Sequence, residues 1–256
     1  MVRFAAFLCL VVVCVAAQTV APAGQEDPSS KRAREIVDKA VQALGGDAYV
    51  KAPGYFYAGR ASGFAKGELN ALSNVFVWIS NDKQRVERAK VPGWVTIFNG
   101  DKGWDITYHG TEPLEAKIQQ AHDRQVTYSL RNVLTKWIRD PKTIYFFDGE
   151  KYAEARQCYS VTLINGNNES ATILFDQQSY LPLKEEWSAR DPEYHDKFTE
   201  SVIYDKFRQV QGIQTPFIVT RYKNDEMTGQ TFVSEAKYMA MPENIFTPEY
   251  KSPAPR

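Results

Sequence analysis

The strongest constraint on the fold of this chain is a long succession of strand-like segments between Tyr55 and Tyr238. Aromatic and β-branched residues are frequent in these segments, and turn-forming residues separate them at intervals of about ten to fifteen residues. Asn99–Gly100 joins two such segments, and this pair is typical of a tight hairpin because both residues tolerate positive φ. Further turns are expected at 165–168, 191–192, 211–212 and 228–229. The pattern predicts an antiparallel meander.

We expect strands at 55–60, 71–80, 84–89, 94–98, 104–108, 144–148, 157–164, 172–176, 183–188, 197–208, 213–223 and 228–238. A sheet of this size must curl, because strongly twisted open sheets rarely exceed about ten strands without doing so.

Two helical stretches accompany the strands. Ser29–Ser30 offers an N-cap to a helix that ends at Gly45–Gly46, and its apolar residues recur at helical spacing. A second stretch, 114–137, has the same periodicity with a break expected near 125–129.

The chain after Met241 is rich in proline and is expected to run over the surface. The expected fold is mainly β (α+β): a curled antiparallel sheet forming an open half-barrel, covered by an N-terminal helix and a helical insertion.

The N-terminus has the order of a secretory signal peptide. Arg3 precedes an unbroken apolar run, and small residues come before Gln18. The run is shorter than the roughly 20 residues that span a bilayer. Cys14 follows Val13, where a lipoprotein signal requires a small residue, so ordinary cleavage is favoured over lipid anchoring at Cys14. We expect a leader at 1–17, a flexible tether at 18–28, one domain at 29–246 and a proline-rich tail at 247–256, with the mature chain in the periplasm.

The composition argues against nucleic acid as a partner. The 31 basic and 31 acidic side chains give a formal net charge of zero. Fourteen Tyr, 14 Phe and five Trp supply apolar area for a core or for the lining of a cavity. Removal of the leader leaves Cys158 as the single cysteine, so no internal disulfide is expected, and its place in a strand predicts a small buried side chain.

Motifs for catalysis or metal binding are lacking. The sequence has no Gly-x-Ser-x-Gly elbow, no His-Glu-x-x-His motif and no glycine-rich phosphate loop. Asp191, His195 and Asp196 fall in a polar turn, for which a solvated loop is a better interpretation than a metal site.

Two further groups of ionisable residues are assigned no chemistry. Glu185 and Glu186 are adjacent on an expected strand and therefore point to opposite faces, so they cannot act as a paired acid and base. His122–Asp123 lies in the second helical stretch and is expected to be solvated. We expect no catalytic residue, no metal and no cofactor.

Several segments taken in order resemble the periplasmic lipoprotein-carrier superfamily of LolA and LolB type, specifically the divergent outer-membrane lipoprotein-sorting proteins. They are the helix 36–46 with the Tyr/Phe-rich strand after it, the hairpin 98–104, the strand–turn–strand 174–186 containing Leu-Pro-Leu-Lys, the segment 207–216 and the closing 244–246. The resemblance spans nearly the whole mature chain. It implies an open β-barrel with a helical lid and a cavity for acyl chains, but no specific cargo.

On this basis we expect a non-catalytic, monomeric carrier or sensor that binds lipid or an acylated protein and exchanges it with membrane-associated donor and acceptor proteins. Large apolar side chains would line its cavity, because burial of apolar area is worth roughly 25 cal/mol per Å². The alternative is a structural or protein-interaction domain of the same fold, in which the same side chains fill the core. The candidate lining residues are Phe76, Trp78, Trp94, Phe98, Trp104, Leu114, Ile118, Val133 and Trp137.

Overall fold

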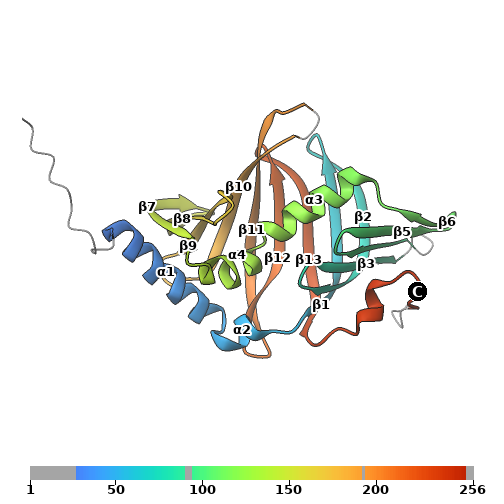
Figure 1. The fold of residues 1–256 in the computed structure, drawn as a ribbon, viewed down its shortest axis with the longest axis horizontal. Helices are drawn as coiled ribbons and strands as arrows, with labels where there is room; N and C mark the ends of the chain where they lie inside the picture. Colours follow the sequence, from blue (N-terminus) through green and yellow to red (C-terminus); the bar gives the residue numbers. More distant parts are fainter. Residues whose placement is uncertain (1–26, 90–93, 192–193, 252–256) are drawn as a thin grey trace, which may run out of the picture.

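The computed structural model describes residues 27–89, 94–191 and 194–251. Within them, thirteen strands form one antiparallel sheet in the order β6-β5-β4-β3-β2-β1-β13-β12-β11-β10-β9-β8-β7 (Figure 1). The sheet is open, so the fold is a mainly-β half-barrel with helices, as predicted. The strands are β1 (Tyr55–Ala65), β2 (Glu68–Ser80), β3 (Lys83–Ala89), β4 (Val95–Asn99), β5 (Lys102–Thr107), β6 (Gly110–Pro113), β7 (Ile144–Ala153), β8 (Arg156–Ile164), β9 (Ser170–Asp176), β10 (Pro182–Arg190), β11 (Lys197–Val210), β12 (Ile213–Lys223) and β13 (Glu226–Tyr238).

The strand order explains the helical insertion. The two edges of the sheet, β6 and β7, are consecutive strands in the chain, so the segment that joins them must cross from one edge to the other. It crosses one face, here called the inner face, as α3 (Ala116–Thr127), α4 (Leu130–Thr135) and a short 3₁₀ helix at Trp137–Arg139 (Figure 1). The break between α3 and α4 falls inside the predicted range 125–129, and the Ser129 hydroxyl accepts a hydrogen bond from the Asn132 backbone to begin α4.

Helix α1 (Pro28–Leu44) covers β7 and β8 at one end of the sheet. It begins slightly before the predicted Ser29–Ser30 cap: the Asp27 carboxylate accepts from the Ser30 backbone at 3.1 Å, and Pro28 occupies the first turn. At its other end Gly45 has φ of 128°, and a short helix α2 (Asp47–Lys51) follows. All six apolar residues of the predicted stripe are buried: Ala33, Ile36, Val37, Ala40, Val41 and Leu44.

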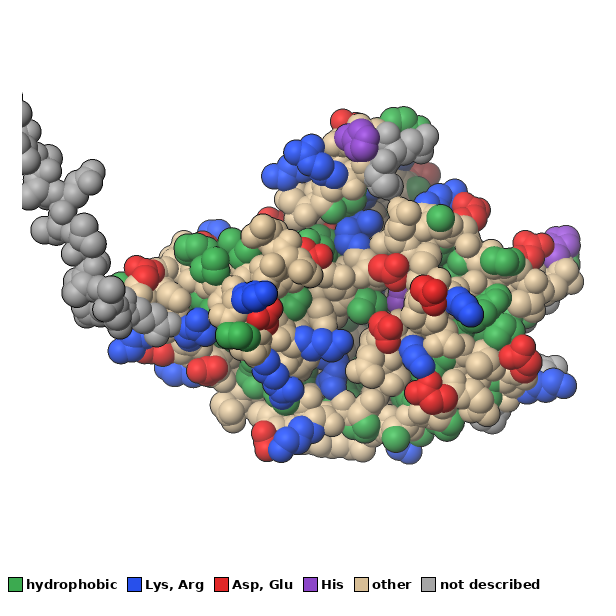
Figure 2. Space-filling view, in the orientation of Figure 1, with side chains coloured by type: hydrophobic (Ala, Val, Ile, Leu, Met, Phe, Trp, Pro, Cys, Tyr) green, Lys and Arg blue, Asp and Glu red, His purple; other side chains and the backbone are tan. Residues whose placement is uncertain are grey.

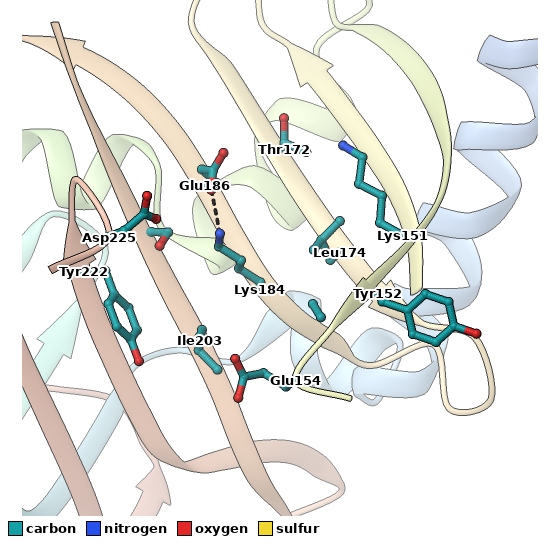
Figure 3. A pocket seen from close by; sticks show the side chains of 12 residues that line it. Lys151, Tyr152, Glu154, Thr172, Leu174, Lys184, Glu186, Ile203, Tyr222 and Asp225 are labelled. Atoms are coloured by element: carbon teal, nitrogen blue, oxygen red, sulfur yellow. Dashed lines mark hydrogen bonds and ion pairs between the residues drawn. The ribbon is translucent and has the colours of Figure 1, made fainter. Parts of the chain in front are cut away.

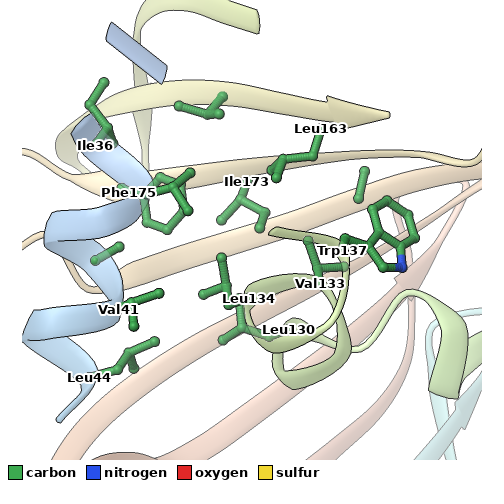
Figure 4. Packing of buried hydrophobic residues seen from close by; sticks show 14 of the residues in the cluster. Ile36, Val41, Leu44, Leu130, Val133, Leu134, Trp137, Leu163, Ile173 and Phe175 are labelled. Carbon is green, nitrogen blue, oxygen red and sulfur yellow. The ribbon is translucent and has the colours of Figure 1, made fainter. Parts of the chain in front are cut away.

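The main core lies between α1, α4 and strands β7 to β12 (Figure 4). Phe175, Ile173 and Leu163 of the sheet are fully buried there against Leu134 and Val133 of α4. Interiors of this kind are packed like organic crystals, so this end of the half-barrel is solid.

A second, smaller core lies on the opposite or outer face of the sheet. The 3₁₀ helix η2 (Glu243–Phe246) packs Ile245 and Phe246 against Ile97 of β4. The Arg85 guanidinium donates to the backbone oxygens of Ile245, Thr247 and Tyr250 at 3.2 Å each. The prediction that the chain after Met241 runs over the surface was therefore wrong for this segment, because two large apolar side chains anchor it.

Other sequence predictions need smaller corrections. The turn expected at 228–229 lies at Asn224–Asp225, where both residues have positive φ, and 228–229 belongs to β13. Strand β6 was not predicted, because its residues are all exposed and show no alternation. Cys158 is fully buried, as expected. The expected leader 1–17 and most of the expected tether 18–28 lie outside the described residues.

Candidate functional site

A cavity of about 160 Å³ lies between α3 and the inner face of the sheet. It is smaller than the roughly 300–1,000 Å³ of typical ligand sites, so this conformation has room for a small group rather than for a whole acyl chain. Its lining, here called the α3 cavity, combines apolar and polar side chains: Ile79, Asn81, Lys83, Gln84, His122, Gln125, Val126, Ser129, Glu185, Trp187, Val202, Tyr204, Val219 and Arg221.

Helix α3 is held over this cavity mainly by polar contacts. The Arg124 guanidinium donates to both carboxylate oxygens of Glu200 at 2.9 and 3.1 Å, and the Trp187 indole N–H donates to the same carboxylate at 2.9 Å. The Gln119 amide donates to the Gly100 carbonyl at 3.0 Å. The residue of α3 that is buried is His122. Figure 2 shows charged side chains and scattered hydrophobic ones on the face that carries α3.

His122 was expected to be solvated, and that prediction was wrong. Its ring stacks on Phe98 with centroids 3.8 Å apart and is only 7 % exposed. Burial lowers the pKa of His122 below its usual value, with Asp123 opposing the shift. The imidazole is therefore neutral near pH 7, and its Nδ1 lies 3.6 Å from the Asp123 carboxylate, beyond hydrogen-bond distance.

Glu185 is the most unusual group in the site, because its side chain is completely buried. The Tyr204 hydroxyl donates to its Oε2 at 2.8 Å, whereas Oε1 has no partner among the described residues. Burial raises the pKa of Glu185 to about 8, and the hydrogen bond from Tyr204 and the nearby Leu130 backbone N–H oppose this rise. The carboxyl group therefore keeps its proton at neutral pH. Sequence reasoning missed it, although the alternation of the strand places position 185 on the same face as the large apolar Trp187 at i+2.

The structure places the nine predicted lining residues on both faces of the sheet, and their role in binding stays a prediction. Phe98 stacks on His122 of α3 on the inner face, Ile118 is a half-buried residue of α3, and Leu114, just before α3, approaches Gly103. Val133 and Trp137 belong to the main core beneath α4.

The other four residues lie elsewhere, and none of the nine predicted residues belongs to the lining of the α3 cavity. Trp78 and Trp104 pack with η2 on the outer face, because adjacent residues such as Ile97 and Phe98 point to opposite sides of a strand. Phe76 lines a hollow on β1, β2 and β13. Trp94 is 38 % exposed, with the Arg88 guanidinium over its ring.

A larger hollow of about 500 Å³ lies on the outer face of strands β7 to β12 (Figure 3). It includes Leu174 and Ile203, but Lys184 and Glu186 pair with each other across it at 2.7 Å, and Tyr152 at its rim is 78 % exposed. It lacks a fully buried polar group such as Glu185. We therefore take the α3 cavity as the candidate site.

Comparison with solved structures identifies the fold. A LolA superfamily protein from Nitrosomonas europaea superimposes with a TM-score of 0.55 at 14% identity, covering 86% of this chain and 99% of that one. A DUF1329 family protein from Desulfovibrio piger gives 0.55 at 10% identity, covering 84% and 97%. A domain described as an outer membrane lipoprotein-sorting protein, from Vibrio parahaemolyticus, gives 0.52 at 9% identity, covering 85% and 97%. The chain therefore has a divergent LolA-like fold.

Sequence comparisons add nothing to this: no protein-family model and no curated protein matches the chain. In the part of the chain that the structure describes, no helix is both long and apolar enough to cross a membrane. No group of three His, Cys, Asp or Glu side chains that could hold a metal ion occurs among the same residues.

Proposed function

We propose that this protein is a non-catalytic periplasmic carrier or sensor that binds the acyl chains of a lipid or lipoprotein between α3 and the inner face of the sheet. The observation that carries the proposal is the contrast within a LolA-like half-barrel: α3 crosses the open sheet with one buried residue, and a cavity remains beneath it. The fold shared with a lipoprotein-sorting domain supports the same class of cargo.

Binding of a whole acyl chain requires α3 to move. The cavity of about 160 Å³ resembles in size an apolar cavity that admits one benzene molecule, and a fatty chain is several times larger. The partly buried Arg124–Glu200 pair, the Gln119–Gly100 hydrogen bond and the His122–Phe98 stack are contacts that must break. Each is worth about 1 kcal/mol, which burial of an acyl chain would exceed.

Lipid binding under α3 is tested by locking this helix. Phe98→Cys and His122→Cys, combined with Cys158→Ala to remove the native thiol, place two thiols on stacked positions of β4 and α3. A short bismaleimide that joins them should abolish uptake of a fluorescent diacylated lipopeptide, and reagent-treated single-cysteine variants are the matched controls. Native mass spectrometry of the uncrosslinked protein from a bacterial host should show co-purified lipid. Undiminished uptake after crosslinking would refute binding under α3.

The second candidate, a protein-interaction domain without lipid cargo, is favoured by the solid core at the α1 end of the half-barrel. The two functions predict different results in the same experiment. An interaction domain should carry no co-purified lipid and should bind no lipopeptide with α3 free or locked.

A further inference from the structure

Three neighbouring strands bring an acid and a cation together on the floor of the α3 cavity. Glu185 of β10 is opposite Val202 of β11, and Val202 is opposite Arg221 of β12. Side chains in register share a face, and strands two apart are separated by roughly 9–10 Å. Glu185 and Arg221 therefore flank Val202 from either side, with Tyr204 next along the same face of β11.

Arg221 is available for a ligand. It lines the cavity and is half-buried, yet its guanidinium forms no ion pair with any residue that the structure describes. Its positive charge acts on two tyrosines of the inner face, since it opposes the rise in the pKa of Tyr57 and of Tyr204. The other cation of the cavity, Lys83, is engaged by Glu243.

Glu185 complements this cation rather than neutralising it. Its Oε2 accepts a hydrogen bond from the Tyr204 hydroxyl, whereas its buried Oε1 has no hydrogen-bond partner among the described residues, and the residue lines the α3 cavity. A buried polar atom without a partner costs about 1–3 kcal/mol, and a ligand that accepts a hydrogen bond there would recover part of it. A protonated carboxyl donor and a guanidinium that flank the same position from either side suit an oxyanion bound between them.

The remaining wall suits the first carbons of a chain. Ile79, Val126, Val202 and Val219 are apolar and line the same cavity. The volume of about 160 Å³ holds a headgroup with a short apolar segment. The rest of a long chain would extend into the space opened when α3 moves.

We propose that Glu185, Tyr204 and Arg221 form a headgroup subsite for the oxyanion end of a single-chain amphiphile, either the carboxylate of a fatty acid or the phosphate of a lysophospholipid. This inference rests on the proposed lipid-binding function and adds the chemistry of the ligand's polar end. The arrangement selects acidic amphiphiles over neutral ones of the same chain length.

Paired ligands test the subsite at mildly acidic pH. The probes are a fluorescent fatty acid with its methyl ester, and lysophosphatidic acid with the monoacylglycerol of the same chain. The wild-type protein should bind each acid roughly tenfold or more tightly than its neutral partner, since hydrogen bonds to charged groups contribute about 1.5–3 kcal/mol. A higher affinity for one acid than for the other identifies the oxyanion as carboxylate or phosphate, and both results support the subsite.

Variants separate charge from packing. Arg221→Gln should weaken binding of the acids roughly tenfold and leave the neutral partners unchanged, whereas the matched Arg60→Gln, an exposed arginine beside the Phe76 hollow, should change neither. Glu185→Gln keeps a donor and an acceptor and should retain acid binding, whereas Glu185→Leu should lose it.

Different experimental results would overturn the proposed subsite and the proposed function. Equal binding of acids and neutral partners, unaffected by Arg221→Gln, would overturn the subsite and leave acyl binding intact. Absence of binding by all four amphiphiles, together with no uptake of the lipopeptide, would overturn the carrier function itself.

Discussion

Helices α1 and α3 cover the same sheet in opposite ways. Helix α1 buries six apolar residues, of which Ile36, Val37, Val41 and Leu44 are large, and such side chains contribute about 1.5–3 kcal/mol each. Helix α3 buries His122 and is held by the Arg124–Glu200 pair and a few hydrogen bonds. One end of the half-barrel is thus a fixed core. At the other end, α3 covers the sheet and can move away from it at a small cost in free energy. Proteins draw their mobile elements from such regions of few buried apolar contacts.

The largest expected effect tests the fixed end. Phe175→Ala removes a fully buried ring from the main core and should lower the free energy of unfolding by about 3–5 kcal/mol, because it leaves a cavity in a packed interior. Ile118→Ala on α3 truncates a half-buried side chain and should cost less than about 1 kcal/mol. Urea denaturation measures both. Similar losses in the two variants would remove the distinction between the regions.

The next effect concerns pH and Glu185. Burial raises the pKa of Glu185 from its usual 4.5 to about 8, so between these values the native chain holds a proton that the unfolded chain has released. The unfolding free energy contributed by this group therefore falls as pH rises through this window, by a total of a few kcal/mol, and levels off above it. Glu185→Gln should remove this fall.

The comparison of wild type with Glu185→Gln isolates Glu185 from His122. The lowered pKa of His122 acts in the opposite direction, since stability from that group rises as pH approaches 6.5. Both proteins retain His122, so its effect cancels in the difference. Urea titrations at several pH values measure that difference, and parallel curves for the two proteins would contradict the ionisation assigned to Glu185.

A smaller effect is expected where α3 meets the sheet. Arg124→Gln removes the bidentate pair with Glu200, and it should increase amide hydrogen exchange in α3 roughly fivefold to tenfold, for a loss of about 1–1.5 kcal/mol. Exchange in α1 should not change. The matched control is Arg32→Gln, which removes an exposed pair within α1. Equal exchange increases in both helices would mean that α3 does not open separately.

The smallest expected effect comes from giving α3 an N-terminal cap of the kind that α1 has. The Asp27 carboxylate caps α1, whereas Glu115 at the start of α3 makes no capping hydrogen bond although its backbone has the extended conformation of an N-cap. Glu115→Ser should add a cap that stabilises α3 against opening by a few tenths of a kcal/mol to about 1 kcal/mol, and hydrogen exchange in α3 should slow accordingly. Faster exchange in this variant would show that the Glu115–Lys117 pair matters more than the missing cap.

Local patterns in the sequence were sufficient to predict most of the helices and strands and the class of fold. The stripe of α1, the hairpin at Asn99–Gly100 and the break before α4 follow from periodicity and turn chemistry, which depend on neighbouring residues. The burial of Ile245 and Phe246 was not predicted, because the surface that covers them comes from β3 and β4, far away in the sequence.

The candidate site shows even more clearly which features follow from local sequence patterns and which depend on tertiary structure. The aromatic side chains predicted an apolar cavity. Because side chains alternate along each strand, however, Trp78 and Trp104 point to the outer face and Phe98 points to the inner face. The choice between faces depends on which side α3 crosses, and no local pattern encodes that.

The sequence by itself determined an antiparallel meander with an amphipathic N-terminal helix and a helical insertion, because these features arise from short-range periodicity. Only the tertiary structure decided that Glu185, Val202 and Arg221 stand in register beneath α3, because strand pairing joins residues that are distant in the chain. Burial then makes an ordinary glutamate a neutral donor, a property that depends on its surroundings and not on its identity.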